Sequence, residues 1–144
     1  MTEQRRGRRE NTMANKRVFL SFLGEDKQRV QGLRLLAANP DYGLEFYDES
    51  VRSAINSSDA DYIKRRIREK ISRTTVTVCL ISEKTHTSRW VGWELQESHD
   101  KGNTIIAMAL KDVERAVLPT LIKQLDLKFH GWNPASLNRL IQAA

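Results

Sequence analysis

The sequence predicts an α/β protein: a flavodoxin-like three-layer sandwich with a five-stranded parallel sheet, strand order 2-1-3-4-5, and helices on both faces. Two stretches indicate this most directly, TVTVCLIS at residues 75–82 and NTIIAMAL at residues 103–110. Both are continuous apolar runs, which are typical of strands with two buried faces. Segments with helical spacing of apolar residues separate the strands, and this alternation favours a parallel sheet covered on both sides.

The first half of the chain contains two predicted strands, a helix between them and a long loop. RVFLSF at residues 17–22 is rich in strand-forming residues, and LEFYD at residues 44–48 is a short second strand. We expect a helix over residues 26–38, and the Asn-Pro pair at residues 39–40 would stop it. Residues 48–59 are polar and weakly patterned, which predicts a loop longer than most such connections.

The second half continues the alternation of helices and strands. In ADYIKRRIREKIS, residues 60–72, the apolar side chains recur at helical spacing, and either Ser58 or Asp59 can serve as the N-cap. Around the two apolar strands, the remaining predicted elements are a helix from about Ser88 to Lys101 that ends at Gly102, a weaker helix at residues 118–125, a short piece at residues 127–129 and a closing helix from Pro134.

Charge and composition describe one globular domain behind a basic leader. The chain has 144 residues, of which 40% are hydrophobic and 29% charged, and its net charge is +6. The first 17 residues hold six basic and two acidic residues, which leaves +2 for the other 127. We expect residues 1–15 to be a disordered leader, because they lack apolar periodicity, and residues 16–144 to form the domain. This distribution argues against a nucleic-acid partner.

Several kinds of protein are excluded by what the sequence lacks. No apolar run approaches the roughly 18 residues of a membrane helix, so we expect no membrane partner. Neither G-x-G-x-x-G nor GxxxxGK[ST] occurs, and three histidines beside one cysteine show no metal-ligand spacing. We therefore expect no metal and no bound cofactor. The single Cys79 lies in a buried strand pattern and has no internal disulfide partner, which predicts a reducing, cytoplasmic setting.

The predicted fold places a candidate crevice at one end of the sheet. Ligands of such folds bind beyond the carboxyl ends of the strands, near the switch point between strands 1 and 3. The turn at residues 23–26, the loop at 48–59 and the loop at 82–88 would surround this crevice. Strand 3 ends in Leu-Ile-Ser-Glu-Lys without a phosphoacceptor aspartate, which excludes a response-regulator receiver. The acidic turn after strand 1 has the wrong charge for a flavodoxin phosphate loop.

TSRWVGWELQES, residues 87–98, supplies the candidate chemistry at this crevice. It opens the helix after strand 3, and its Trp90 and Glu94 are four residues apart and therefore neighbours on one helix face. Trp93 flanks both. A carboxylate beside indole rings is partly desolvated, which strengthens its electric field. The alternative interpretation of the same pattern is a solvated Glu94 with both tryptophans in the core.

Two motifs, in this order, resemble those of TIR domains. RVFLSFLGED resembles the opening strand and turn of plant TIR domains, and SRWVGWEL resembles their S-x-W-C-x-x-E-L helix start. YIKRRIREKISRTTVTVCLIS, the following T-x-x-S-R-W-V-x-W-E pattern and GNTIIA are similar in particular to the bacterial TIR-like proteins of Thoeris antiphage defence. The resemblance covers about residues 16–110. It departs at Val91, where plant domains have cysteine, and at Leu23, where they have arginine.

The resemblance implies an enzyme that cleaves the nicotinamide–ribose bond of NAD, with Glu94 as the catalytic residue. NAD is then a substrate, and the product is ADP-ribose or a cyclic isomer that reaches a separate effector protein as a diffusible signal. The resemblance also leaves self-association open. Two other functions remain open: a non-enzymatic TIR-like interaction module, and an enzyme like the nucleoside deoxyribosyltransferases, which also place a Glu against a ribosyl carbon.

Around Glu94 we expect a pocket built from the ends of several strands. The expected substrate-binding residues are Ser21, Phe22 and Leu23 after strand 1, Asp48 after strand 2, Ser82 after strand 3, and Trp90 as a wall beside the ribose or nicotinamide. Gly24 is expected to let the chain turn closely over the sheet end. Asp26 is expected to cap the following helix with its carboxylate. The alternative is that Glu25 and Asp26 are only the start of that helix.

Overall fold

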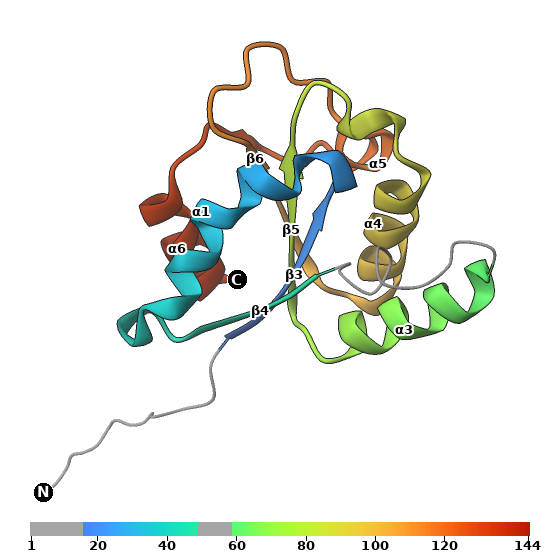
Figure 1. Cartoon of the computed structure of the whole chain (residues 1–144), viewed down its shortest axis with the longest axis horizontal. Coiled ribbons are helices and arrows are strands. Elements are labelled where there is room, and N and C mark those ends of the chain that lie inside the picture. Colours follow the sequence, from blue (N-terminus) through green and yellow to red (C-terminus); the bar gives the residue numbers. More distant parts are fainter. Residues whose placement is uncertain (1–15, 49–58) are drawn as a thin grey trace, which may run out of the picture.

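A computed structural model of the chain describes residues 16–48 and 59–144. In this part of the protein, strands and helices alternate and build one sheet between two helical layers (Figure 1). The predicted leader, residues 1–15, and residues 49–58 of the long loop lie outside the described residues. Within the described part, none of the helices is long and apolar enough to cross a membrane.

The sheet has five parallel strands in the order β4-β3-β5-β6-β7. In chain order this is 2-1-3-4-5, which confirms the predicted topology. β3 pairs with β4 on one side and with β5 on the other, so the carboxyl ends of β3 and β5 form the switch point. The strands are β3 (Lys16–Phe22), β4 (Leu44–Asp48), β5 (Val76–Ile81), β6 (Thr104–Ala109) and β7 (Phe129–His130).

Helices cover both faces of this sheet, α1 and α6 on one face and α3, α4 and α5 on the other (Figure 1). Their bounds are α1 (Lys27–Ala38), α3 (Ala60–Ser72), α4 (Arg89–Lys101), α5 (Thr120–Gln124) and α6 (Pro134–Ala143). Short 3-10 turns precede α1, β4 and α4, at η1 (Gly24–Asp26), η2 (Pro40–Tyr42) and η3 (Thr85–Thr87). The arrangement is the predicted flavodoxin-like α/β fold.

The alternation of side chains along β3 decides which of its residues can face a given helix. Every second residue, Val18, Leu20 and Phe22, points into the core beneath α1 and α6. The residues between them, Phe19 and Ser21, point toward α3 and α4. A β3 side chain that meets α4 must therefore belong to this second set.

The ends of α3 and α4 form as the sequence predicts. Asp59 caps α3 by accepting a hydrogen bond from the Tyr62 N–H at 3.0 Å. Ser88 caps α4 by accepting one from the Val91 N–H at 3.1 Å. Gly102 ends α4 in the left-handed conformation, with φ 97°, which glycine adopts without the strain that a side chain would bring. Because each helix follows a strand of the parallel sheet, these two caps place both helix starts at its carboxyl edge.

Candidate active site

α4 carries the central residue of the site on its buried face. Val91, Glu94, Leu95 and Ser98 follow the spacing of one helix face, and all four are buried. Two of them are polar, and buried polar groups need hydrogen-bond partners. Ser98 finds one on β5, where the Thr77 hydroxyl donates to its hydroxyl oxygen at 2.8 Å. Glu94 finds one on β3.

The Glu94 carboxylate lies against the end of β3. The residue is 0% exposed, and the Ser21 hydroxyl donates a hydrogen bond to Glu94 Oε1 at 2.7 Å, across 73 residues of sequence. The solvated interpretation of Glu94 is therefore wrong. Ser21 is next to Cys79 in the register of β3 and β5. Burial raises the pKa of the Cys79 thiol, and the nearby Glu94 charge raises it further, so the thiol stays neutral.

Trp90 and Trp93 lie on the α3 side of α4, the helix that carries Glu94. Their ring centroids are 6.0 Å apart with an interplanar angle of 87°, an edge-to-face arrangement that aromatic pairs favour. Both side chains are half-buried and pack against the cluster formed by Phe19 and three isoleucines of α3. One part of the Trp90 side chain therefore packs on the core and another part is exposed, and its contact with a substrate stays a prediction.

Two cations of α3, which the sequence analysis did not single out, lie over the Trp93 ring. Lys64 Nζ is 5.6 Å and Arg68 Cζ 5.5 Å from the ring centroid, within the range of cation–π attraction. Arg68 also donates to Glu97 Oε1 at 2.7 Å. In the sequence, the four-residue spacing of Lys64 and Arg68 indicates that the two cations share one face of α3. It does not tell which helix the pair faces.

A second polar cluster joins the turn after β3 to the loop after β5. Ser82 Oγ donates to Asp26 Oδ2 at 2.5 Å, the Ser82 N–H donates to Thr85 Oγ1 at 2.7 Å, and all three residues are buried. Arg29 Nη1 lies 3.5 Å from Asp26 Oδ1 and 3.3 Å from Glu83 Oε1. The expectation that Asp26 caps the next helix is wrong, because its carboxylate bonds the neighbouring strand end and Arg29 instead.

The other predicted residues lie less directly at Glu94. Phe22 is 1% exposed with its ring in the core beneath α1 and α6, on the opposite face of the sheet, so substrate contact stays a prediction for its backbone. Leu23 is half-buried in the turn after β3. Asp48 ends β4, and its side chain lies outside the described part. Gly24 is exposed with open space at Cβ and no positive φ, so the expected need for glycine there is wrong.

Glu94 is closed off in this state. In residues 16–48 and 59–144, no group of three or more His, Cys, Asp or Glu side chains is arranged to hold a metal ion. A surface hollow along α3 is lined by Arg65, Arg66, Arg68, Glu69 and Ser72, and neither Glu94 nor Ser21 lines it. Because Glu94 is 0% exposed, a substrate reaches its carboxylate only after the atoms over it move.

Solved structures of several proteins share this fold. A CMP N-glycosidase, BcmB, of Clostridium botulinum superposes with a TM-score of 0.58 at 17% identity, covering 88% of this chain and 99% of the other. A 2-deoxyribosyltransferase of Bacillus psychrosaccharolyticus gives 0.60 at 13%, covering 85% and 90%. The TIR domain of the Toll-related receptor TRR-2 of Hydra magnipapillata gives 0.56 at 15%, covering 88% and 91%. At these identities the likeness shows the fold alone.

Sequence similarity is more specific than the fold. Residues 19–115 match the family model described as Thoeris protein ThsB, TIR-like domain. A Bacillus cereus (strain MSX-D12) protein named "Putative cyclic ADP-D-ribose synthase ThsB1" is 33% identical over 104 residues, 67% of this chain and 54% of the relative. This chain thus spans about half the length of the curated relative it matches. Because the family model covers more than half of the sequence, Glu94 included, the chain belongs to the Thoeris ThsB family of TIR-like domains, as its motifs predicted.

Proposed function

We propose that this protein cleaves the nicotinamide–ribose bond of NAD, with Glu94 as the catalytic residue, and forms a cyclic ADP-ribose-type product. The observation that carries the proposal is the buried Glu94 carboxylate, held by Ser21 at the switch point of the sheet. Ligands of such sheets bind at this edge. Membership of the TIR-like family and the name of the Bacillus cereus relative support the same chemistry.

One carboxylate suffices for the bond-breaking step because nicotinamide leaves as a neutral base. The electron pair of the C1′–N bond goes to the ring nitrogen, which was cationic in NAD, so no general acid is needed. The ribose carbon becomes oxocarbenium-like, and a carboxylate beside it stabilises the developing positive charge. Glu94 is 0% exposed, and the low dielectric of such surroundings strengthens this attraction.

The second step decides the product. Attack of water on C1′, with loss of a proton, gives ADP-ribose, whereas attack by a ring nitrogen or hydroxyl of the same molecule gives a cyclic isomer. The half-buried rings of Trp90 and Trp93 offer apolar surface next to Glu94. Such surface displaces water when a substrate binds, and the exclusion of water favours internal capture. This argument supports the cyclic product.

The wider role in the proposal comes from the family and not from the geometry. The cyclic product is a diffusible signal that activates a separate effector protein in antiphage defence. A diffusible signal needs no contact between this chain and the effector, so NAD is the partner that the site itself must recognise. Self-association that assembles the active site stays a prediction.

Incubation of the purified protein with NAD, and separately with deoxynucleosides, tests the proposal against both alternatives. We expect free nicotinamide and a cyclic ADP-ribose isomer by liquid chromatography and mass spectrometry, with the deoxynucleosides unchanged. Free base from deoxynucleosides would instead indicate a deoxyribosyltransferase-like enzyme. Neither product, in dilute protein and in a crowded solution that promotes self-association, would contradict the proposal and favour the interaction module.

A further inference from the structure

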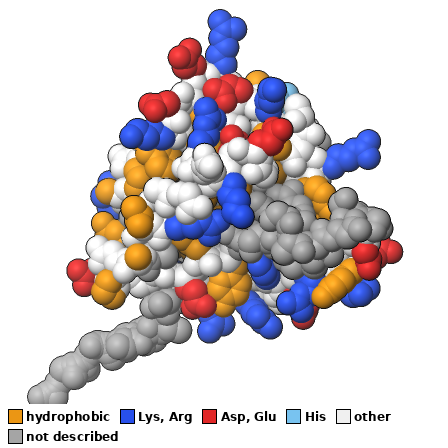
Figure 2. Space-filling view, viewed as in Figure 1, with side chains coloured by type: hydrophobic (Ala, Val, Ile, Leu, Met, Phe, Trp, Pro, Cys, Tyr) orange, Lys and Arg blue, Asp and Glu red, His pale blue; other side chains and the backbone are white. Residues whose placement is uncertain are grey.

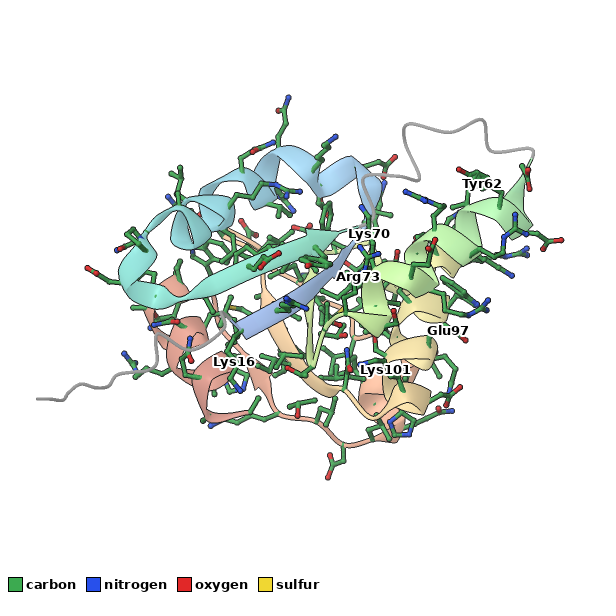
Figure 3. The ribbon with its side chains drawn as sticks, turned by 90° about the horizontal axis from the view of Figure 1, so that it is seen from below. Lys16, Tyr62, Lys70, Arg73, Glu97 and Lys101 are labelled. Atoms are coloured by element: carbon green, nitrogen blue, oxygen red, sulfur yellow. The ribbon has the colours of Figure 1, made fainter. Side chains whose placement is uncertain are left out.

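The boundary between α3 and α4 brings a cation and two aromatic rings to the edge that holds the catalytic carboxylate. Trp90 lies one helical turn before Glu94, the Trp93 ring is 6.0 Å from the Trp90 ring, and Lys64 Nζ is 5.6 Å from the Trp93 centroid. α3 and α4 lie side by side (Figure 3), and both start at the carboxyl edge of the sheet. Lys64, the fifth residue of α3, is therefore near the same edge as Trp90.

Some of the basic side chains near this edge already have a carboxylate partner, and others do not. Residues 60–73 hold six basic and two acidic residues, and basic side chains gather over α3 at the lower edge of the molecule (Figure 2). Arg68 donates to Glu97 at 2.7 Å, and Arg29, on the α1 side, pairs with two carboxylates. Among the residues that the structure describes, Lys64 has no carboxylate partner. Its charge is available to an incoming anion.

The proposed reaction places an anion near this cation. The diphosphate of NAD is joined to the reacting ribose through the 5′ oxygen, so it lies only a few bonds from the carbon that Glu94 must reach. The diphosphate and the Glu94 carboxylate are both negative, and they repel each other strongly where water is excluded. A lysine ammonium offsets this repulsion and donates charge-assisted hydrogen bonds to phosphate oxygens.

We propose that Lys64 binds the diphosphate of NAD at the α3–α4 boundary, beside Trp93 and next to the Glu94 site. The assignment rests on the proposed NAD cleavage and adds a substrate-binding residue to it. The half-buried Lys64 side chain holds its ammonium over the indole of Trp93. Long basic side chains commonly pack their stems on apolar surface in this way while the charged group stays near water. Lys64 meets the phosphates and not the ribosyl carbon, so it acts on NAD binding and leaves the bond-breaking step to Glu94.

The substitution Lys64→Met separates the charge from the packing, because methionine keeps an unbranched stem against Trp93. With NAD we expect KM to rise on the order of tenfold at unchanged kcat, the sign of a lost binding contact. Nicotinamide riboside has the same scissile bond and no phosphate, and its kcat/KM should not change. Lys64→Arg should retain the wild-type KM for NAD. Arg66→Gln, which removes an exposed charge 3.8 Å from Glu69 on the same helix, should change neither substrate.

Calorimetric titrations with ADP and with adenosine give a readout that does not depend on catalysis. The wild-type protein should bind ADP more tightly than adenosine, and Lys64→Met should weaken ADP binding on the order of tenfold while adenosine stays unchanged. If the wild-type protein releases no nicotinamide, the proposed function fails, and the ADP titration still decides the role of Lys64. Unchanged ADP binding in Lys64→Met, equal losses with NAD and nicotinamide riboside, or no wild-type preference for ADP would each overturn the assignment.

Discussion

The hydrogen bond from Ser21 to Glu94 joins two segments that are 73 residues apart into one site. Ser21→Ala removes the donor, and a buried carboxylate that loses a partner costs about 1–3 kcal/mol of unfolding free energy. We expect this loss in urea titrations. We also expect kcat for nicotinamide release to fall on the order of tenfold, because the carboxylate loses part of its fixed orientation.

A double-mutant cycle provides the control for Ser21. In a Glu94→Gln background the hydroxyl no longer serves a charged partner, so Ser21→Ala should cost less unfolding free energy than in the wild-type protein. Contacting residues couple in this way, whereas independent ones add. Equal costs in the two backgrounds would show that Ser21 stabilises the protein without acting through Glu94.

Cys79 gives a test of burial at the same point of the sheet. Burial first, and the Glu94 charge second, raise the pKa of its thiol in the folded protein. An unfolded chain ionises its thiol near about pH 8.5. The thiol therefore contributes stability that is present below about pH 8.5 and is lost as the pH rises, because the unfolded state gives up its proton first. At pH 8, iodoacetamide should alkylate Cys79 only as fast as the protein opens, and rapid alkylation of the native protein would contradict its burial.

At the scale of elements, α4 presents a core-facing surface and a surface toward α3, and Trp90 stands at the border between them. Trp90→Ala should reduce nicotinamide release more than it reduces stability, because the side chain is only half-buried. A fully buried tryptophan loses about 3–5 kcal/mol on truncation, so we expect about half of that here. Thermal unfolding and NAD kinetics of Trp90→Ala and Trp93→Ala check this. A large loss of stability with unchanged kcat in the folded fraction would favour the core interpretation of Trp90.

The carboxyl end of β3 shows how far a strand pattern predicts the residues of a site. Ser21 and Phe22 were both expected at the substrate, but neighbours in a strand point to opposite faces of the sheet. The structure places the Ser21 hydroxyl on Glu94 and the Phe22 ring in the other core. The alternation itself was present in the sequence. Which face α4 would cover was not, because that depends on the path of the chain between strands.

Contacts between loops were the least predictable part of the candidate site. Asp26 was expected to bond to the start of its own helix, because an acidic residue at a helix start has local N–H groups to accept from. Its buried bond to Ser82, 56 residues away, wins instead. The position of Lys64 over Trp93 was equally unpredictable. Both helices were predicted from the sequence, but the rotation of one helix relative to the other was not.

At the scale of the whole molecule, the topology was predictable because its determinants are local. Apolar runs such as those of β5 and β6 require burial on both faces, and short connections with intervening helices then force a parallel order. The net charge of the domain did not predict where its basic residues gather. The +2 of residues 18–144 conceals a surplus of four positive charges in residues 60–73, which acidic side chains elsewhere in the chain offset.

The central claim is that the fold positions one buried carboxylate, that of Glu94, to act on the ribose of NAD. The substitution Glu94→Gln tests this claim most directly. The substitution keeps the size and helix preference of the side chain and removes its charge. Nicotinamide release should fall by on the order of 10²–10³, with thermal unfolding close to that of the wild-type protein. A folded Glu94→Gln protein that releases nicotinamide at the wild-type rate would contradict the account.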